Sequence, residues 1–180
     1  MTFLVIQLEK DIEKLKDTLN KLESDEKKFK YEYEKIDFVE MYVEVLKTYN
    51  DRFNIYIKMF IDFIDKLLGQ ISFYKNNLSD VFDKNDNNSS QNILNICDCS
   101  QNLLNVYKKQ FSNYSRLISS YVNFFDISSD DTTLIQYYND FDTNDFIETL
   151  EDFLEESRDF DKDQYDIAKN LGWVEWFGLY

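Results

Sequence analysis

The chain has 180 residues and a formal net charge of −15 at pH 7, and 43% of its residues are hydrophobic. That hydrophobic content excludes disorder over the whole chain, and the strong negative charge excludes direct binding to nucleic acid. Proline is absent and there are only three glycines. Because these residues punctuate turns, we expect few and long elements. No run of 18 apolar residues is present, so the sequence predicts no transmembrane helix and a cytoplasmic protein.

Apolar residues in the first fifth of the chain recur at alternating steps of three and four, which is the spacing of a coiled-coil seam. We expect one helix here, over about residues 4–35. Such a seam must be covered, so it predicts packing within the chain or a homodimer through residues 5–36. The seam consists of Val5, Leu8, Ile12, Leu15, Leu19, Leu22, Glu26, Phe29, Tyr33 and Ile36.

Two further long helices are predicted downstream. From Phe38 to Phe82 the apolar residues recur at a mean step near the helical period, which predicts a helix over 38–82. The polar segment 83–90 is typical of a loop. A third helix is expected over 91–125, with one apolar face and one face of Asn, Ser, Gln and Lys. No segment shows the alternation of a β-strand, so the sequence predicts an all-α protein.

The last 55 residues differ in charge and in element length. They hold 16 acidic and three basic side chains, a net charge of −13. Shorter helices are expected at 134–141, 145–160 and 164–171. We therefore expect an elongated antiparallel bundle, a coiled-coil hairpin of three long helices, over residues 1–125. A small acidic helical cap with an aromatic tail is expected over residues 126–180.

One interpretation of the acidic segment is a cation site. Asp140, Asp142 and Asn144 fall at positions one, three and five of an EF-hand-like loop, and Glu151 falls at position twelve. The pattern departs from such loops at position six, where Asp145 replaces the glycine of the sharp turn. A second run, Asp159, Asp161 and Asp163, lacks a glutamate at position twelve. We expect no bound metal and no cofactor, and the first four residues are the metal candidates.

A second interpretation is a binding surface for a protein with a basic surface. A helix at 145–160 can bury its apolar stripe and direct its carboxylates outward, which creates a fixed negative field. The alternative is that the charge only keeps an aromatic-rich chain soluble. The candidate partner-binding residues are Glu148, Glu151, Asp152, Glu155 and Glu156.

The C-terminal segment "NLGWVEWFGLY" concentrates large apolar side chains, among them Trp173 and Trp176. Such a segment either closes the core by packing between helices or forms an exposed patch for a partner, because tryptophan and tyrosine dominate interface energetics. Both tryptophans are therefore further candidates for partner binding.

The sequence gives no indication of catalysis. Histidine, the commonest general base, is absent. There is also no glycine-rich phosphate loop and no nucleophile motif. We expect a non-catalytic protein-binding module, such as an inhibitor or immunity-type protein of microbial or viral origin. The alternative is a structural coiled-coil protein that homo-oligomerises through its N-terminal helix.

Overall fold

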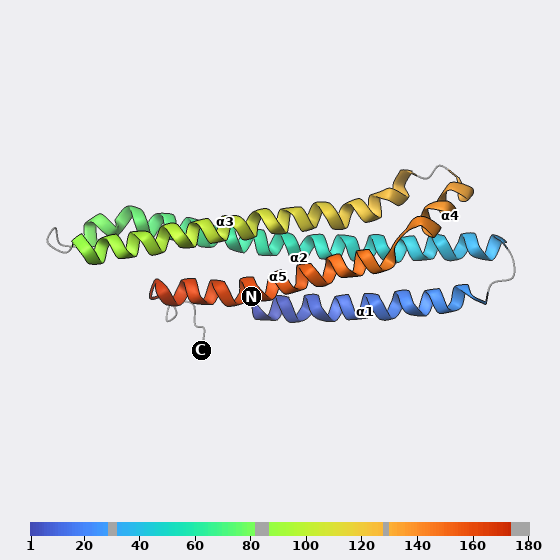
Figure 1. The fold of residues 1–180 in the computed structure, drawn as a ribbon, viewed down its shortest axis with the longest axis horizontal. Coiled ribbons are helices and arrows are strands. Elements are labelled where there is room, and N and C mark those ends of the chain that lie inside the picture. The colour runs from blue at the N-terminus through green and yellow to red at the C-terminus, as the bar shows by residue number, and fades with distance from the viewer. Residues whose placement is uncertain (29–31, 82–86, 128–129, 174–180) are drawn as a thin grey trace.

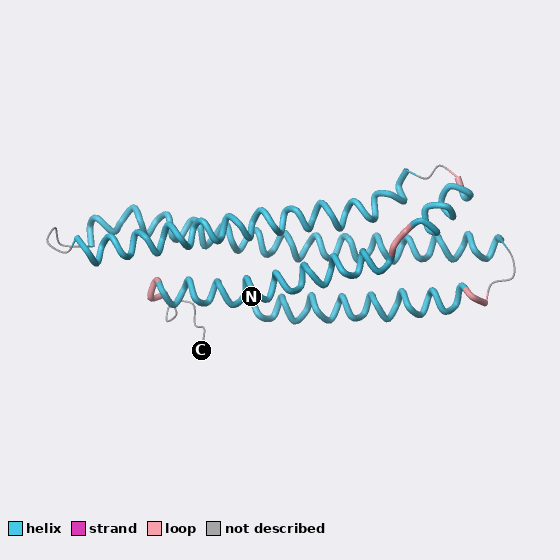
Figure 2. The backbone as a smooth tube through the Cα atoms, in the orientation of Figure 1, coloured by secondary structure: helices cyan, strands magenta, loops and turns pink. Residues whose placement is uncertain are grey.

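A computed structural model describes residues 1–28, 32–81, 87–127 and 130–173 of the chain. All regular structure in these residues is helical and no strand occurs among them (Figure 2), which confirms the all-α prediction. None of the described helices has a stretch long and apolar enough to cross a lipid bilayer.

Four long helices run side by side, each antiparallel to its neighbours (Figure 1). Contacts join α1 to α2, α2 to α3, α3 to α5, and α5 back to α1, so the four helices close a ring. A short helix, α4, crosses one end of the bundle between α3 and α5. The elements are α1 (Thr2–Glu26), α2 (Glu32–Val81), α3 (Asn87–Asn123), the 3₁₀ turn η1 (Phe124–Ile127), α4 (Asp131–Asp140) and α5 (Thr143–Asn170).

The first helix is shorter than expected. It ends at Glu26 instead of near residue 35, and α2 begins at Glu32. Residues 23–28, "ESDEKK", carry no apolar side chain, so nothing there rewards a continued helix. The reversal at this point lets Phe38 pack back into the same core as α1.

The seam of α1 is covered within the chain. Leu8 and Leu15 are completely buried and Leu19 nearly so, and they belong to one core cluster with residues of α2 and α5. The part of the seam at Phe29 lies outside the described residues. These side chains already have intramolecular neighbours, so the described part of the seam does not require a second copy. A homodimer through residues 5–36 stays a prediction.

The largest difference from the sequence prediction concerns the C-terminal region. The expected elements 145–160 and 164–171 form one continuous helix, α5, which is the fourth helix of the bundle and not a separate cap. Its buried side chains recur at alternating steps of four and three, as a bundle seam requires. This seam consists of Phe146, Leu150, Phe153, Ser157, Phe160, Gln164 and Ile167, and Leu154 and Ala168 are buried beside it.

Two polar residues disguise this seam in the sequence. Ser157 is completely buried, and its hydroxyl donates to the Phe153 carbonyl at 2.7 Å, so its polar group is satisfied inside the helix. Gln164 is also buried and donates from its amide to the Asp161 carbonyl at 3.1 Å. Both residues can therefore occupy core positions, because each donates a hydrogen bond to a backbone carbonyl of its own helix.

Aromatic rings hold α5 in the ring of helices. Phe60 of α2 and Phe111 of α3 have ring centroids 5.0 Å apart. Phe153 and Phe160 of α5 each lie edge-on to Phe60 at 6.0 Å. All four rings are completely buried. Edge-to-face geometry at these distances is favourable beyond the area buried.

Candidate functional site

The outer face of α5 is fixed by the start of the helix and by its buried seam. Asp142 is the N-cap, and its side chain accepts hydrogen bonds from the backbone N–H groups of Asn144 at 2.9 Å and Asp145 at 3.2 Å. A carboxylate at this position satisfies free N–H groups of the first turn and opposes the positive end of the helix dipole. Because the start of α5 and its buried seam are both fixed, the side chains on the opposite face of the helix point toward solvent in fixed directions.

A stripe of carboxylates, here called the acidic ridge, runs along this outer face. It consists of Glu148, Asp152, Glu155 and Asp159, which recur at steps of four, three and four and so share one side of the helix. All four side chains are exposed. Among the residues that the structure describes, none of the four forms an ion pair.

Two cations near the ridge, Lys16 and Arg158, are already engaged. Glu151, beside the ridge on the α1 side, pairs with Lys16 of α1. Arg158 of α5 pairs with Glu9 of α1, with Nη2 2.6 Å from Oε1. Both pairs tie α5 to α1, so Glu151 acts in helix packing and is less available to a partner than was expected.

Glu156 lies on the opposite flank, toward α3, and is half-buried. Burial raises the pKa of its carboxyl group, and the nearby charges of Asp159, Asp163 and Glu155 raise it further. Burial, Asp152 and Glu156 likewise raise the pKa of Tyr114 on α3. The negative field of α5 therefore extends over the α3–α5 boundary.

In the structure, the five carboxylates predicted to bind a partner fall into three groups. Glu148, Asp152 and Glu155 are exposed on the ridge, Glu151 is paired, and Glu156 is half-buried. Asp159 was not among the expected partner-binding residues. The signal that could have found it is its spacing, because it continues the same stripe four residues after Glu155.

The EF-hand-like arrangement does not form. From Thr143 onward the chain is helical, so Glu151 lies about 13 Å along the helix axis from the N-cap Asp142. An EF-hand loop must instead wrap its ligands around one point. Over the described ranges, no group of three or more His, Cys, Asp or Glu side chains is placed to hold a metal ion.

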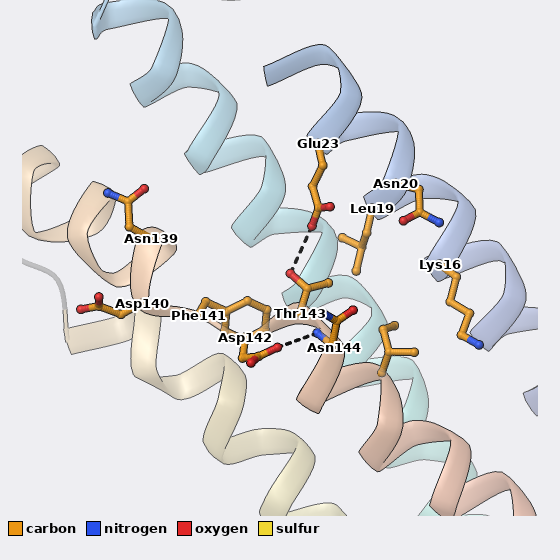
Figure 3. A pocket seen from close by; sticks show the side chains of 11 residues that line it. Lys16, Leu19, Asn20, Glu23, Asn139, Asp140, Phe141, Asp142, Thr143 and Asn144 are labelled. Atoms are coloured by element: carbon orange, nitrogen blue, oxygen red, sulfur yellow. Dashed lines mark hydrogen bonds between the residues drawn. The ribbon is translucent and has the colours of Figure 1, made fainter. Parts of the chain in front are cut away.

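Asp140, Asp142 and Asn144 line an open hollow of about 650 Å³ where the α4–α5 corner meets α1 (Figure 3). Lys16 and Asn20 stand on the α1 side of it. The hollow is lined by one amine together with several carboxylates and amides.

Hydrogen bonds at this corner hold the start of α5 against the bundle. The Thr143 hydroxyl donates to Glu23 of α1 at 3.2 Å (Figure 3). The same hydroxyl also contacts the Tyr42 hydroxyl at 2.7 Å. Nearby, Tyr138 of α4 donates to Glu26 at 2.9 Å. The corner therefore sets where the acidic ridge begins.

Trp173 follows the end of α5 and is half-buried. Its ring lies edge-on to Tyr74 of α2, with centroids 5.8 Å apart. Trp176 lies outside the described residues.

Comparisons with protein-family models, with curated proteins and with solved structures found no match to this chain.

Proposed function

We propose that this chain is a non-catalytic protein-binding module that binds the basic surface of a partner protein through the acidic ridge. The observation that carries the proposal is the ridge itself: four exposed carboxylates on one side of a helix whose other side is anchored in the core. Size and acidity favour an inhibitor or immunity-type protein of microbial or viral origin, acting in the cytoplasm.

The charge of α5 is one-sided in a way that solubility alone does not require. The helix holds ten acidic and three basic residues, whereas the longer α2 holds nine acidic and six basic residues. Like charges four residues apart, such as Glu148 and Asp152, destabilise a helix by about 0.2–0.5 kcal/mol per pair. A surface that serves only to prevent aggregation normally carries positive and negative charges mixed together.

A basic partner would relieve this repulsion on binding. The ridge would also attract such a partner before contact, because a field of one sign raises the rate of association. Both effects are screened by salt. Salt-sensitive binding is therefore the property that this proposal requires.

Two other features support a non-catalytic role for the ridge. The chain contains no histidine, so the commonest general base is missing. The ridge carboxylates are exposed on the outer face of α5, whereas active sites usually lie in clefts or cavities. Homo-oligomerisation through the N-terminal helix has no comparable support, because that seam is buried within the chain.

The test compares the wild-type chain with a ridge variant that carries Glu148→Gln, Asp152→Asn, Glu155→Gln and Asp159→Asn. Proteins from a lysate of the source cells are captured on the immobilised chain, and affinity for the purified captured protein is then measured at low and high salt. We expect the ridge variant to bind at least about tenfold more weakly and to lose most of the salt dependence.

The matched control removes the same amount of charge from another helix. Glu40, Glu44, Asp51 and Asp62 are exposed on α2, and their amide variants change the net charge equally. This control should keep nearly full affinity. Equal weakening of the two variants would show that only total charge matters and would refute a ridge-specific role, as would unchanged binding by the ridge variant.

A further inference from the structure

A hollow of about 340 Å³, here called the α3–α5 groove, lies between α3 and the last turns of α5. It combines apolar side chains of both helices with carboxylates of α5. Its lining includes Ile96, Cys99 and Leu103 of α3, and Asp163, Asp166 and Ile167 of α5. The groove therefore has an apolar side and an acidic side.

The apolar side of the groove is open to solvent. Cys99 is exposed, and Leu103 is 37% exposed. Val106 follows Leu103 by three residues and is 52% exposed. Because side chains three and four residues apart share one face of a helix, α3 presents a continuous apolar stripe beside α5. Contiguous exposed apolar side chains next to charged ones are typical of protein-interaction sites.

The acidic side of the groove continues the acidic ridge. Asp163 and Asp166 follow Asp159 at steps of four and three, so they lie on the same side of α5. Asp163 is half-buried and accepts a hydrogen bond from the Tyr107 hydroxyl at 2.6 Å, whereas Asp166 is exposed. Within the described residues neither aspartate forms an ion pair, so their charge is left for a cation from outside.

The basic residues of the same stretch of α5 lie on another side of the helix. Arg158 pairs with Glu9 of α1 and so marks the α1 side. Lys162 and Lys169 follow Arg158 at steps of four and seven, which places them on that side too. They therefore point away from the groove, which is on the α3 side.

We propose that the α3–α5 groove binds an amphipathic helix of the partner protein, with apolar side chains of that helix in the hollow and lysine or arginine side chains against Asp163 and Asp166. This inference rests on the proposed function and names the kind of segment that the ridge attracts. Charge complementarity selects a basic segment, and the apolar lining selects one with an apolar face. Between Ile96 and Leu103 the groove extends over about 10 Å, or about two turns of a bound helix.

A helix fits this groove better than an extended peptide does. An extended peptide gains its affinity by adding a strand to an exposed sheet edge, and the part of the chain that the structure describes contains no strand. A helix instead places apolar side chains three, four and seven residues apart on one face, with its charged side chains beside them. That arrangement matches an apolar hollow with carboxylates along one side.

The groove contains its own reporter, because Cys99 is exposed whereas Cys97, the other cysteine of the chain, is buried. Burial also raises the pKa of the Cys97 thiol, which keeps it unreactive. The probe is a synthetic helical peptide of leucine and lysine, about four turns long, with its leucines on one face. At saturating peptide, alkylation of Cys99 by N-ethylmaleimide should slow at least about fivefold, because the docked leucines cover the thiol.

The direction of this change separates docking from attraction by charge alone. A cationic peptide held only by the ridge would favour the thiolate and so would not slow the reaction of Cys99. Two controls accompany the measurement. A peptide of the same composition, with its leucines distributed around the helix, should not protect Cys99. A variant with Cys99→Ser and Leu117→Cys moves the thiol to an exposed position of α3 outside the groove, where the first peptide should not protect it.

A matched pair of leucine substitutions locates the binding site. Leu103 and Leu117 are both exposed on α3, at 37% and 48%, but only Leu103 lines the groove. Leu103→Gln should weaken the binding of the leucine–lysine peptide at least about fivefold, since it removes an apolar contact. Leu117→Gln should leave the affinity unchanged. Circular dichroism should show wild-type helicity for both variants, because both side chains are partly exposed.

Four results would overturn the inference. The leucine–lysine peptide could fail to slow the alkylation of Cys99, the peptide with distributed leucines could protect it equally, or the two leucine variants could act alike. Alternatively, Cys99 could become protected as the chain is concentrated without peptide, together with a dimer in sedimentation, which would assign the groove to a second copy. The proposed function fails separately, because it is decided by the ridge variant: weaker binding by that variant with Cys99 unprotected would retain the ridge and reject the groove.

Discussion

Asp11 of α1 and Arg52 of α2 form an ion pair in which Nη1 of Arg52 donates to Oδ1 of Asp11 at 3.0 Å. The Asp11 side chain is only 10% exposed, whereas that of Arg52 is 50% exposed. The other oxygen of Asp11 accepts a hydrogen bond from the Tyr56 hydroxyl. A buried carboxylate with two fixed donors on α2 defines the height at which α1 packs, in the way that polar residues fix the register of coiled coils.

Asp11→Ala should therefore destabilise the fold by about 1–3 kcal/mol, since it leaves two donors without their acceptor. Asp11→Asn should cost less, because its carbonyl oxygen can still accept from Tyr56. Urea unfolding followed by circular dichroism measures both changes. Asp17→Ala, at an exposed position of the same helix, is the control and should stay within about 0.5 kcal/mol of wild type. Equal effects at Asp11 and Asp17 would contradict a register role for Asp11.

The place of α5 in the bundle predicts a large effect at Phe153. This ring is completely buried and lies edge-on to Phe60 and Phe111, so Phe153→Ala should cost about 3–5 kcal/mol. Tyr165 lies on the same helix and is 41% exposed, so Tyr165→Ala should cost much less. Urea unfolding of both variants separates a bundle helix from a loosely attached cap, for which the two costs would be small and similar.

The long helices could be predicted from sequence because their apolar periodicity is nearly uninterrupted. The predicted seam residues Leu8 and Leu15 of α1 are buried as expected, and so are Phe53 and Phe60, which belong to the apolar series expected over 38–82. The end of α1 could not be predicted in this way. Residues 23–28 are compatible with a helix by intrinsic propensity, so their lack of apolar side chains permits an end to α1 without fixing where it falls. The end at Glu26 also depends on α2 folding back onto α1.

The role of α5 was hidden by two polar residues and by its charge. The heptad seam from Phe146 to Ile167 is regular, but Ser157 and Gln164 occupy core positions in it. Each satisfies its polar group with a carbonyl of its own helix, a possibility that a hydrophobic pattern does not register. For the candidate site, the outward direction of the carboxylates could be predicted. The pairing of Glu151 with Lys16 depends on the packing of α5 against α1 and could not.

Stability at alkaline pH should depend on buried tyrosine hydroxyls. Burial, with the charges of Glu23 and Glu26, raises the pKa of Tyr42 to about 12. Burial, with the hydrogen bond to Asp11, raises the pKa of Tyr56 to about 12. Because the folded chain holds these protons more tightly than the unfolded chain, whose tyrosine pKa is about 10, their stabilising contribution is complete below about pH 10 and is lost as the pH rises toward 12.

Parallel titrations of tyrosinate absorbance and circular dichroism test this expectation. Some of the 13 tyrosines should ionise before helicity changes, and the remainder should ionise together with unfolding. A Tyr56→Phe variant should show a shallower loss of stability above about pH 10, because one raised pKa is removed. Ionisation of all tyrosines with helicity intact would contradict the burial of these hydroxyls.

Replacing Glu156 should stabilise the fold, whereas replacing Asp11 or Phe153 should destabilise it. Burial and the neighbouring carboxylates Asp159, Asp163 and Glu155 raise its pKa, so its ionised form is unfavourable in the folded state. The stabilising effect of its proton is complete below the unfolded pKa of about 4.3 and is lost as the pH rises through the higher folded value.

At neutral pH, Glu156→Gln should therefore stabilise the fold by a few tenths of a kcal/mol, the scale of like-charge pairs on a helix. At pH values below the unfolded pKa this gain should disappear, because wild-type Glu156 is then neutral as well. Asp62→Asn on the exposed face of α2 is the control, and urea unfolding at the two pH values provides the measurement. A gain of equal size at both pH values would mean that the side-chain shape, and not the charge, is responsible.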